Sequence, residues 1–247
     1  MTQGLSCQLY SARNFPPLDS QLATLAGLGY KNVEPFGGLH ANLDALAGGL
    51  KAYGLKAPSG HFAFDMLETA TDKAVSIAKK LGTHLVIAPY LLPPQRPVDA
   101  AGWKVFGHRL SKVRHKLAND DLTLGWHNHD FEMFALPDGT TPMQHILEAD
   151  PELKWEADIG WIVRGKADPV ALLKKYAHQV AALHVKDIAA PAEPVVEDGW
   201  ADVGHGTIDW AKVMAAAPKG VLLVAEHDNP SDFARFARRS LATVQGW

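Results

Sequence analysis

The sequence predicts an α/β fold, a single-domain closed (β/α)8 barrel formed by residues 1–247. Strand-like stretches alternate with amphipathic helical patterns eight times along the chain. The 247 residues suit one barrel of this kind, and no Ser/Gly-rich linker or break in composition divides them. Several expected strands contain continuously apolar runs (VIA, LLVA and AALHV), which is typical of strands covered on both faces.

The first half of the chain supplies four strand–helix pairs. Strands are expected at residues 5–12, 31–36, 55–62 and 83–89. Helices are expected after them at about residues 18–28, 43–50, 69–81 and 103–117. Leucines recur every three or four residues in the first of these helices, so one of its faces can pack on the sheet.

The second half repeats the pattern. Strands are expected at residues 122–129, 153–158, 180–185 and 220–228, and helices at about 143–149, 169–178, 209–217 and 231–244. The stretch from the sixth to the seventh strand reads as a β-α-β unit, with a polar turn directly after Asp158. Because such units connect parallel strands, Asp158 and His184 should lie near the carboxyl ends of neighbouring strands.

Composition excludes several classes of function. The formal net charge is −3, and no basic stripe indicates binding to nucleic acid or to a membrane surface. No apolar run reaches the ~18 residues of a membrane span, and the start MTQGLSCQLY lacks the features of a signal peptide. The single cysteine, Cys7, rules out an internal disulfide. We therefore expect a cytoplasmic protein that acts on a small molecule.

Ionisable residues gather where the expected strands end. Strand interiors are almost free of such groups, so the charge is concentrated at one rim of the barrel, where barrel enzymes bind their ligands. In strand order the rim residues include Glu34, His61, His127, His129, Glu132, Asp158, His184, Lys186 and Glu226.

Three of these residues predict a metal site. Asp158, His184 and Glu226 come from three successive strands and offer two carboxylates and one imidazole around one point. With one more ligand from the fifth strand, this set would suit Mn²⁺, Mg²⁺, Co²⁺ or Zn²⁺. Each residue alone could be an ordinary helix cap or a solvated loop residue, but their shared position at strand ends favours the metal.

Five motifs carry a resemblance to a known family. They are WHNHDFE (126–132), DIGW (158–161), HVKD (184–187), VGHGTIDW (203–210) and EHDNP (226–230). In order and spacing they resemble the sugar phosphate isomerase/epimerase family of the xylose isomerase-like TIM-barrel superfamily, and the similarity runs from the first strand to the eighth. That superfamily also includes inosose dehydratases, ketose 3-epimerases and abasic-site nucleases of the endonuclease IV type.

The resemblance implies one divalent metal, with Mn²⁺ as the first choice, held by residues of strands five to eight. The matching residues are Asp158, His184 and Glu226. Many relatives carry a glutamate at the end of strand five, where this chain has His127. We expect Glu132 to fold back as the fourth ligand, with His127 or His129 as the alternative.

The resemblance also implies isomerisation or epimerisation of a sugar or keto-sugar through an enediolate. The metal would polarise the substrate oxygens, and Glu132 and Glu226 would be the catalytic acid and base. Residues expected to bind substrate are Glu34, His61, His127, His129, Trp161 and Lys186. The sequence has no Gly-rich phosphate loop and no Arg/Lys cluster at the last two strands, which favours an unphosphorylated substrate.

Other readings stay open at this point. A lyase of the inosose dehydratase type would begin from the same enediolate. An endonuclease IV-like hydrolase could use Glu34 and His61 as further ligands, but the acidic charge balance opposes it. A sugar-binding protein without turnover is the third alternative. Trp200 and its loop are a candidate interface for a homodimer.

Overall fold

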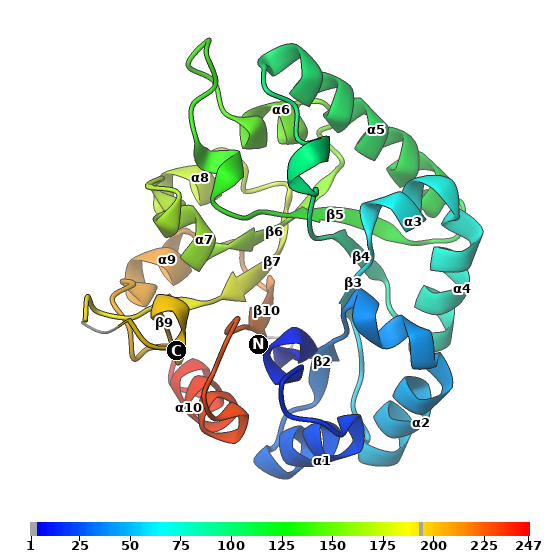
Figure 1. The fold of residues 1–247 in the computed structure, drawn as a ribbon, viewed down its shortest axis with the longest axis vertical. Coiled ribbons are helices and arrows are strands. Elements are labelled where there is room, and N and C mark those ends of the chain that lie inside the picture. Colours follow the sequence, from blue (N-terminus) through cyan, green and yellow to red (C-terminus); the bar gives the residue numbers. More distant parts are fainter. Residues whose placement is uncertain (1–3, 193–194) are drawn as a thin grey trace.

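The computed structural model describes residues 4–192 and 195–247. Eight parallel strands form a ring in the order β2-β1-β10-β7-β6-β5-β4-β3, with the helices outside it (Figure 1). The ring strands are β1 (Leu5–Gln8), β2 (Asn32–Glu34), β3 (Ser59–His61), β4 (Leu85–Ala88), β5 (Thr123–His127), β6 (Lys154–Asp158), β7 (Val180–Val185) and β10 (Leu222–Ala225). The helices are α1 (Leu18–Leu28), α2 (Leu43–Tyr53), α3 (Phe64–Thr69), α4 (Thr71–Leu81), α5 (Ala100–Ala118), α6 (Pro142–Glu148), α7 (Ile159–Arg164), α8 (Pro169–Lys175), α9 (Trp210–Ala216) and α10 (Phe233–Gln245).

The predicted single-domain barrel is confirmed, and it is nearly rather than fully closed. The strands β2 and β3 are the two ends of the hydrogen-bonded order. Three backbone hydrogen bonds cross between them: Val33 N to Lys56 O (2.8 Å), Lys56 N to Lys31 O (2.9 Å) and His61 N to Pro35 O (2.8 Å). These bonds hold the seam together, although only one isolated bridge pairs the two segments as strands.

Short-range sequence signals explain where several helices begin and end. The helices α1, α2 and α4 each end on a glycine with left-handed backbone, namely Gly29, Gly54 and Gly82. A glycine adopts this conformation without steric cost, and its N–H satisfies a carbonyl of the last turn. The helices α8, α9 and α10 begin after an aspartate whose side chain accepts a backbone N–H of the first turn.

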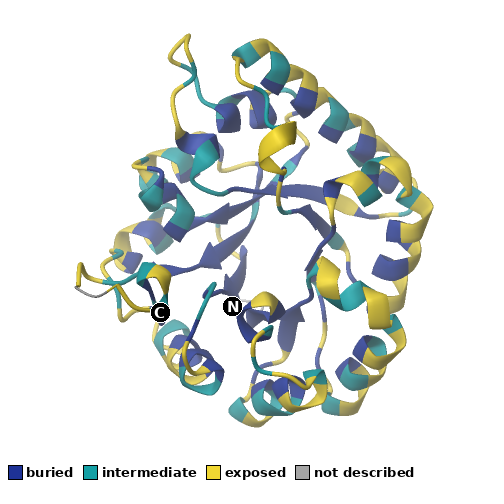
Figure 2. Ribbon diagram, in the orientation of Figure 1, coloured by how far each residue is buried: buried dark blue, intermediate teal, exposed yellow. Residues whose placement is uncertain are grey.

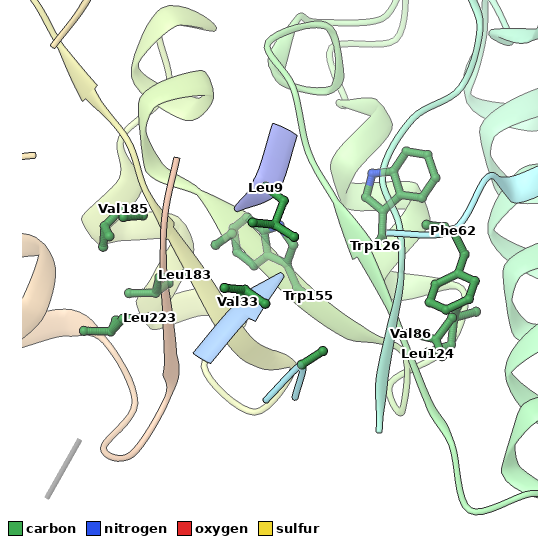
Figure 3. Packing of buried hydrophobic residues seen from close by; sticks show 14 of the residues in the cluster. Leu9, Val33, Phe62, Val86, Leu124, Trp126, Trp155, Leu183, Val185 and Leu223 are labelled. Atoms are coloured by element: carbon green, nitrogen blue, oxygen red, sulfur yellow. The ribbon is translucent and has the colours of Figure 1, made fainter. Parts of the chain in front are cut away.

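Residues alternate along each strand between the helix layer and the barrel interior. Trp126, Trp155, Leu183 and Leu223 belong to the main hydrophobic core against the helices, where Figure 3 shows them packed. Figure 2 shows the same arrangement as buried strands surrounded by helices with exposed outer faces. Because side chains alternate with period two, the residues between these positions point into the barrel.

The barrel interior has an apolar floor and a polar upper part. A separate small cluster contains Ala182, Leu222 and Val224, with Leu85 packed against it. His184 follows Ala182 by two residues, and Glu226 follows Val224 by two, so each lies on the same strand face one step nearer the carboxyl end. The floor therefore excludes water from below, while polar groups occupy the level above it.

The loops differ from the predicted pattern in three places. The expected polar turn after Asp158 is the short helix α7, and the helix expected from about residue 69 is preceded by a separate helix, α3. After β7, a two-stranded antiparallel hairpin of β8 (Asp187–Ile188) and β9 (Trp200–Ala201) forms over the rim. Among the helices in the described part of the chain, none combines the length and apolar character needed to cross a membrane.

Candidate metal centre

The structure brings Asp158, His184 and Glu226 together, and His127 joins them from β5. Ligand atoms of these four buried residues all lie within 4.8 Å of one another. We call this set the rim group. His184 Nδ1 is 3.0 Å from Glu226 Oε2 and 3.8 Å from Asp158 Oδ2, and His127 Nε2 is 3.9 Å from the same Asp158 oxygen.

The rim group fits a divalent metal. Asp158 Oδ2 is buried and has no hydrogen-bond partner among the described residues, a costly arrangement for a carboxylate oxygen unless a cation neutralises it. The nearest cationic side chain is Lys186, whose Nζ is 3.7 Å away, beyond hydrogen-bond distance. The other oxygen of Asp158 accepts the backbone N–H of Trp161 at 2.8 Å, which caps α7 and fixes the carboxylate. Two imidazoles and two carboxylates are a donor set typical of Mn²⁺, Co²⁺ or Zn²⁺ and less typical of Mg²⁺.

A second group lies deeper in the barrel. It contains His61, His127, Glu156 and His184, again with ligand atoms within 4.8 Å of one another, and we call it the inner group. Glu156 Oε2 is 2.7 Å from His61 Nε2, 3.1 Å from His127 Nδ1 and 3.0 Å from His184 Nε2. The two groups therefore share the rings of His127 and His184.

Glu132, the ligand expected from strand five, belongs to neither group. The 3-10 turn Phe131–Met133 buries its side chain, where one oxygen accepts Trp126 Nε1–H at 3.1 Å and the other accepts His129 N–H at 2.8 Å. Burial raises the pKa of Glu132 to about 8 despite these bonds. The strand-five residue that faces the other ligands is thus His127, one of the two alternatives.

Glu34 lies inside the barrel rather than at the rim. Its Oε1 is 2.8 Å from Gln8 Nε2 and 2.8 Å from His184 Nε2, and it is also 3.1 Å from His61 Nε2. Burial would raise its pKa, but His61 and His184 hold the pKa of Glu34 below its usual range. Arg13, the other partner considered for Glu34, instead donates to Tyr10 O and to Asp228 O.

Lys186 is fully buried beside the rim group and does not pair with Asp187. Its Nζ donates to Asp228 Oδ1 at 2.6 Å and to Glu226 Oε2 at 3.0 Å. Burial would raise the pKa of Glu226, but Lys186 and His184 outweigh that effect and lower it, so Glu226 is charged. Asp187 instead accepts the backbone N–H groups of the loop after the β8–β9 hairpin and Trp210 Nε1–H.

A cavity of about 690 Å³ opens beside the rim group. Four of the residues expected to bind substrate line it: His61, His127, His129 and Trp161. Glu226 is also in its wall, whereas Glu34 and Lys186 are not. The remaining lining residues are Tyr10, Phe36, Gly37, Ala63, Phe64, Asp65, Pro89, Tyr90, Leu92, Gln95 and Asp228.

Several side chains near the cavity have fixed protonation states or positions. Burial, with Lys186 nearby, lowers the pKa of His129 to about 3, so its ring is neutral, and its buried Nδ1 has no partner among the described residues. Trp161 packs edge-on against Trp200, at 4.7 Å between ring centroids. Trp200 itself is only 2% exposed, so a homodimer contact at this loop would have to use its other residues, of which Val195 and Val196 are exposed.

Sequence reasoning missed Glu156. The expectation that strand interiors lack ionisable groups is wrong at this position, which lies in the middle of β6 and is fully buried. The signal was present, because Glu156 precedes Asp158 by two residues and so points to the same side of the strand. This two-residue spacing indicates that the side chain of Glu156 is a second carboxylate directed into the barrel.

Comparison with known proteins assigns the family. The sequence profile of the xylose isomerase-like TIM barrel family matches residues 22–241, and the chain belongs to this family. A curated relative is the rhizopine catabolism protein MocC of Rhizobium meliloti, which is 23% identical over 268 residues, covering 92% of this chain and 82% of MocC.

Solved structures share the fold at low sequence identity. A sugar phosphate isomerase/epimerase from Parabacteroides distasonis superposes with a TM-score of 0.79 at 20% identity, covering 99% of this chain and 94% of that one. The IolI protein with a bound zinc atom gives a TM-score of 0.74 at 15% identity, covering 99% and 96%. The 3-keto-D-glucoside 4-epimerase YcjR from E. coli gives a TM-score of 0.69 at 16% identity, covering 99% of each chain.

Proposed function

We propose that this protein is a divalent-metal-dependent isomerase or epimerase of an unphosphorylated sugar or keto-sugar, acting through an enediolate. One observation carries the proposal: four metal-ligand side chains converge at the wall of a cavity large enough for a sugar, and two of them, His127 and Glu226, line that cavity. The zinc atom of the related IolI protein and the named activity of the YcjR epimerase support it.

The rim group would hold the ion through His127, Asp158, His184 and Glu226. When bound, the ion supplies Lewis-acid stabilisation of negative charge on the substrate oxygens. Mn²⁺ stays the first choice because the resemblance implies it, with Mg²⁺, Co²⁺ and Zn²⁺ as alternatives, and the two imidazoles suit Zn²⁺ and Co²⁺ better than Mg²⁺.

Glu226 is the proposed base. It is a charged carboxylate in the cavity wall, and Lys186 and His184 hold one of its oxygens in place. It would remove the proton from the carbon beside the carbonyl and, for isomerisation, return it to the neighbouring carbon. Epimerisation would need a second acid that delivers a proton to the other face of the same carbon, the role predicted for Glu132. Glu132 remains a predicted acid/base group, but its burial outside the rim group favours a structural role in holding the His129 loop.

The cavity wall indicates the class of substrate. His129 contributes a neutral imidazole to the wall, and Trp161 and Tyr90 supply apolar faces. Asp65 and Asp228 line the same cavity, and no lysine or arginine is among its described lining residues. This wall favours an uncharged polyol or sugar over a phosphorylated one, and it opposes binding of a nucleic acid.

A dehydratase is the second candidate, because dehydration begins with the same proton removal. Asp228 lines the cavity beside Glu226 and would be the acid that protonates a leaving hydroxyl. Burial raises the pKa of Asp228, and Lys186, which donates to it at 2.6 Å, opposes that rise.

We also propose a cytoplasmic location, because a chain with one cysteine forms no internal disulfide and so suits a reducing compartment.

The proposal predicts solvent exchange at the carbon next to the carbonyl. Metal-loaded protein is incubated in D₂O with ketoses, keto-inositols and 3-keto-glycosides, and deuterium is followed by NMR. We expect deuterium exchange with at least one unphosphorylated compound of this panel. That compound should also turn over faster than its own phosphate ester. Loss of a hydroxyl after exchange would identify the dehydratase, and no exchange across the panel would contradict both reactions.

A further inference from the structure

Each of the two histidine rings in the rim group also touches the inner group. His184 directs Nδ1 to Glu226 Oε2 (3.0 Å) and Nε2 to Glu156 Oε2 (3.0 Å) and Glu34 Oε1 (2.8 Å). His127 directs Nδ1 to Glu156 Oε2 (3.1 Å) and Nε2 toward Asp158 Oδ2 (3.9 Å). One nitrogen of each ring therefore faces the rim, and the other faces the interior.

A neutral imidazole has one N–H and one lone pair, and a carboxylate can only accept hydrogen bonds. Without an ion, both nitrogens of His184 face carboxylates at hydrogen-bond distance, so this ring can carry both hydrogens. When an ion takes the rim-facing nitrogens, each ring keeps the hydrogen on its other nitrogen. That hydrogen is on Nδ1 of His127, which faces Glu156, and on Nε2 of His184, which faces Glu156 and Glu34. The lone pairs then lie on His127 Nε2 and His184 Nδ1. Both are directed at the carboxylate oxygens of the rim group.

Lone pairs facing carboxylate oxygens repel one another unless a cation lies between them. With an ion in the rim group, the hydrogens held on the inner side leave both rim-facing lone pairs available to that ion. Metal-ligating histidines commonly donate their second N–H to a carboxylate, which fixes the ring and raises its basicity.

The same geometry argues against a second ion in the inner group. With ions on both sides, His127 and His184 would each have to lose both ring hydrogens and become imidazolates. Neutral imidazole, and not imidazolate, is the ordinary metal ligand. One ion in the rim group and the carboxylates of the inner group together give each ring nitrogen of His127 and His184 a partner.

We propose that Glu156 is a positioning residue that sets the tautomers of His127 and His184, so that one divalent ion binds in the rim group and none in the inner group. This inference rests on the proposed metal-dependent function. Glu156 itself does not line the cavity, so it acts through the two rings and not on the substrate. Its Oε1 is buried without a hydrogen-bond partner among the described residues, as Asp158 Oδ2 is, so the number of bound ions measured below decides between the two groups.

The first test reads the tautomers in the wild-type protein, so it does not depend on a variant that folds. Protein with ¹⁵N-labelled histidine is loaded with Zn²⁺, and long-range ¹H–¹⁵N correlations are recorded. We expect a protonated Nδ1 and a metal-bound Nε2 for His127, and the reverse for His184. A protonated Nε2 on His127, or metal bound through its Nδ1, would overturn the proposal.

The second test compares Zn²⁺ affinity, measured by competition with a chromophoric chelator, between wild type and Glu156→Gln. We expect a loss of about 10- to 100-fold, the usual effect of removing such a supporting carboxylate. Asp150→Asn is the matched control, because Asp150 is a buried carboxylate in the loop that precedes β6, where it accepts hydrogen bonds from Ser111 and Arg114. Its affinity should stay within about twofold of wild type, on the scale of an uncoupled site.

The metal content separates the possible failures. One ion per wild-type chain with unchanged affinity in Glu156→Gln would overturn this inference and leave the proposed function intact. Two ions per chain would show that the inner group binds metal and would also overturn it. No bound ion in the wild type would overturn the proposed function together with this inference.

Discussion

Replacing Glu226 with glutamine is expected to slow deuterium exchange into the substrate by about 10²- to 10⁴-fold at saturating metal, the range for loss of a general base. The amide cannot accept the carbon-bound proton, although it retains the shape of the carboxylate. Lys186 would still be held by Asp228 Oδ1 at 2.6 Å, so the rim should keep its arrangement. Exchange is measured by NMR on the best substrate of the panel.

The control for this variant is Asp150→Asn, which removes a buried carboxylate away from the cavity. It should exchange deuterium at the wild-type rate. Circular dichroism and metal content verify that both variants are folded and loaded. A Glu226→Gln protein that exchanges as fast as wild type would remove this residue from the reaction.

Saturating Zn²⁺ or Mn²⁺ is expected to raise the Tm of the wild-type protein by roughly 8–16 °C. An ion that binds only the folded chain adds about 4 kcal/mol at a free concentration near 1,000 times its Kd. For a chain of this size, each kcal/mol shifts Tm by about 2–4 °C. The shift is measured by calorimetry against protein dialysed with a chelator.

Replacing Asp158 with asparagine should remove most of this metal-dependent increase in Tm. Asparagine retains an oxygen that can cap α7 at Trp161, so the variant removes the charge while keeping that local bond. An equal Tm shift in Asp158→Asn and wild type would indicate that the ion binds elsewhere in the protein.

The sequence predicted the barrel because its strongest signals are local. Helical periodicity, glycines such as Gly29 after a helix and continuously apolar strands are all readable without tertiary contacts. Short elements were not predicted, because their sequence signals are weaker. The helix α7 contains only six residues, Ile159–Arg164, and its formation depends on the cap from Asp158.

The candidate site was predictable in part for the same reason. Asp158, His184 and Glu226 lie at or directly after strand ends, so the barrel topology alone brings them together. The position of Glu132 depends on a 3-10 turn and on the bonds to Trp126 and His129, which no periodicity reveals.

The cation site itself is tested most directly by anomalous diffraction. Crystals loaded with Zn²⁺ are measured on both sides of the zinc absorption edge. The account predicts one peak per chain, about 2.0–2.2 Å from ligand atoms of His127, Asp158, His184 and Glu226. A peak between His61 and Glu156, or no peak inside the barrel, would contradict it.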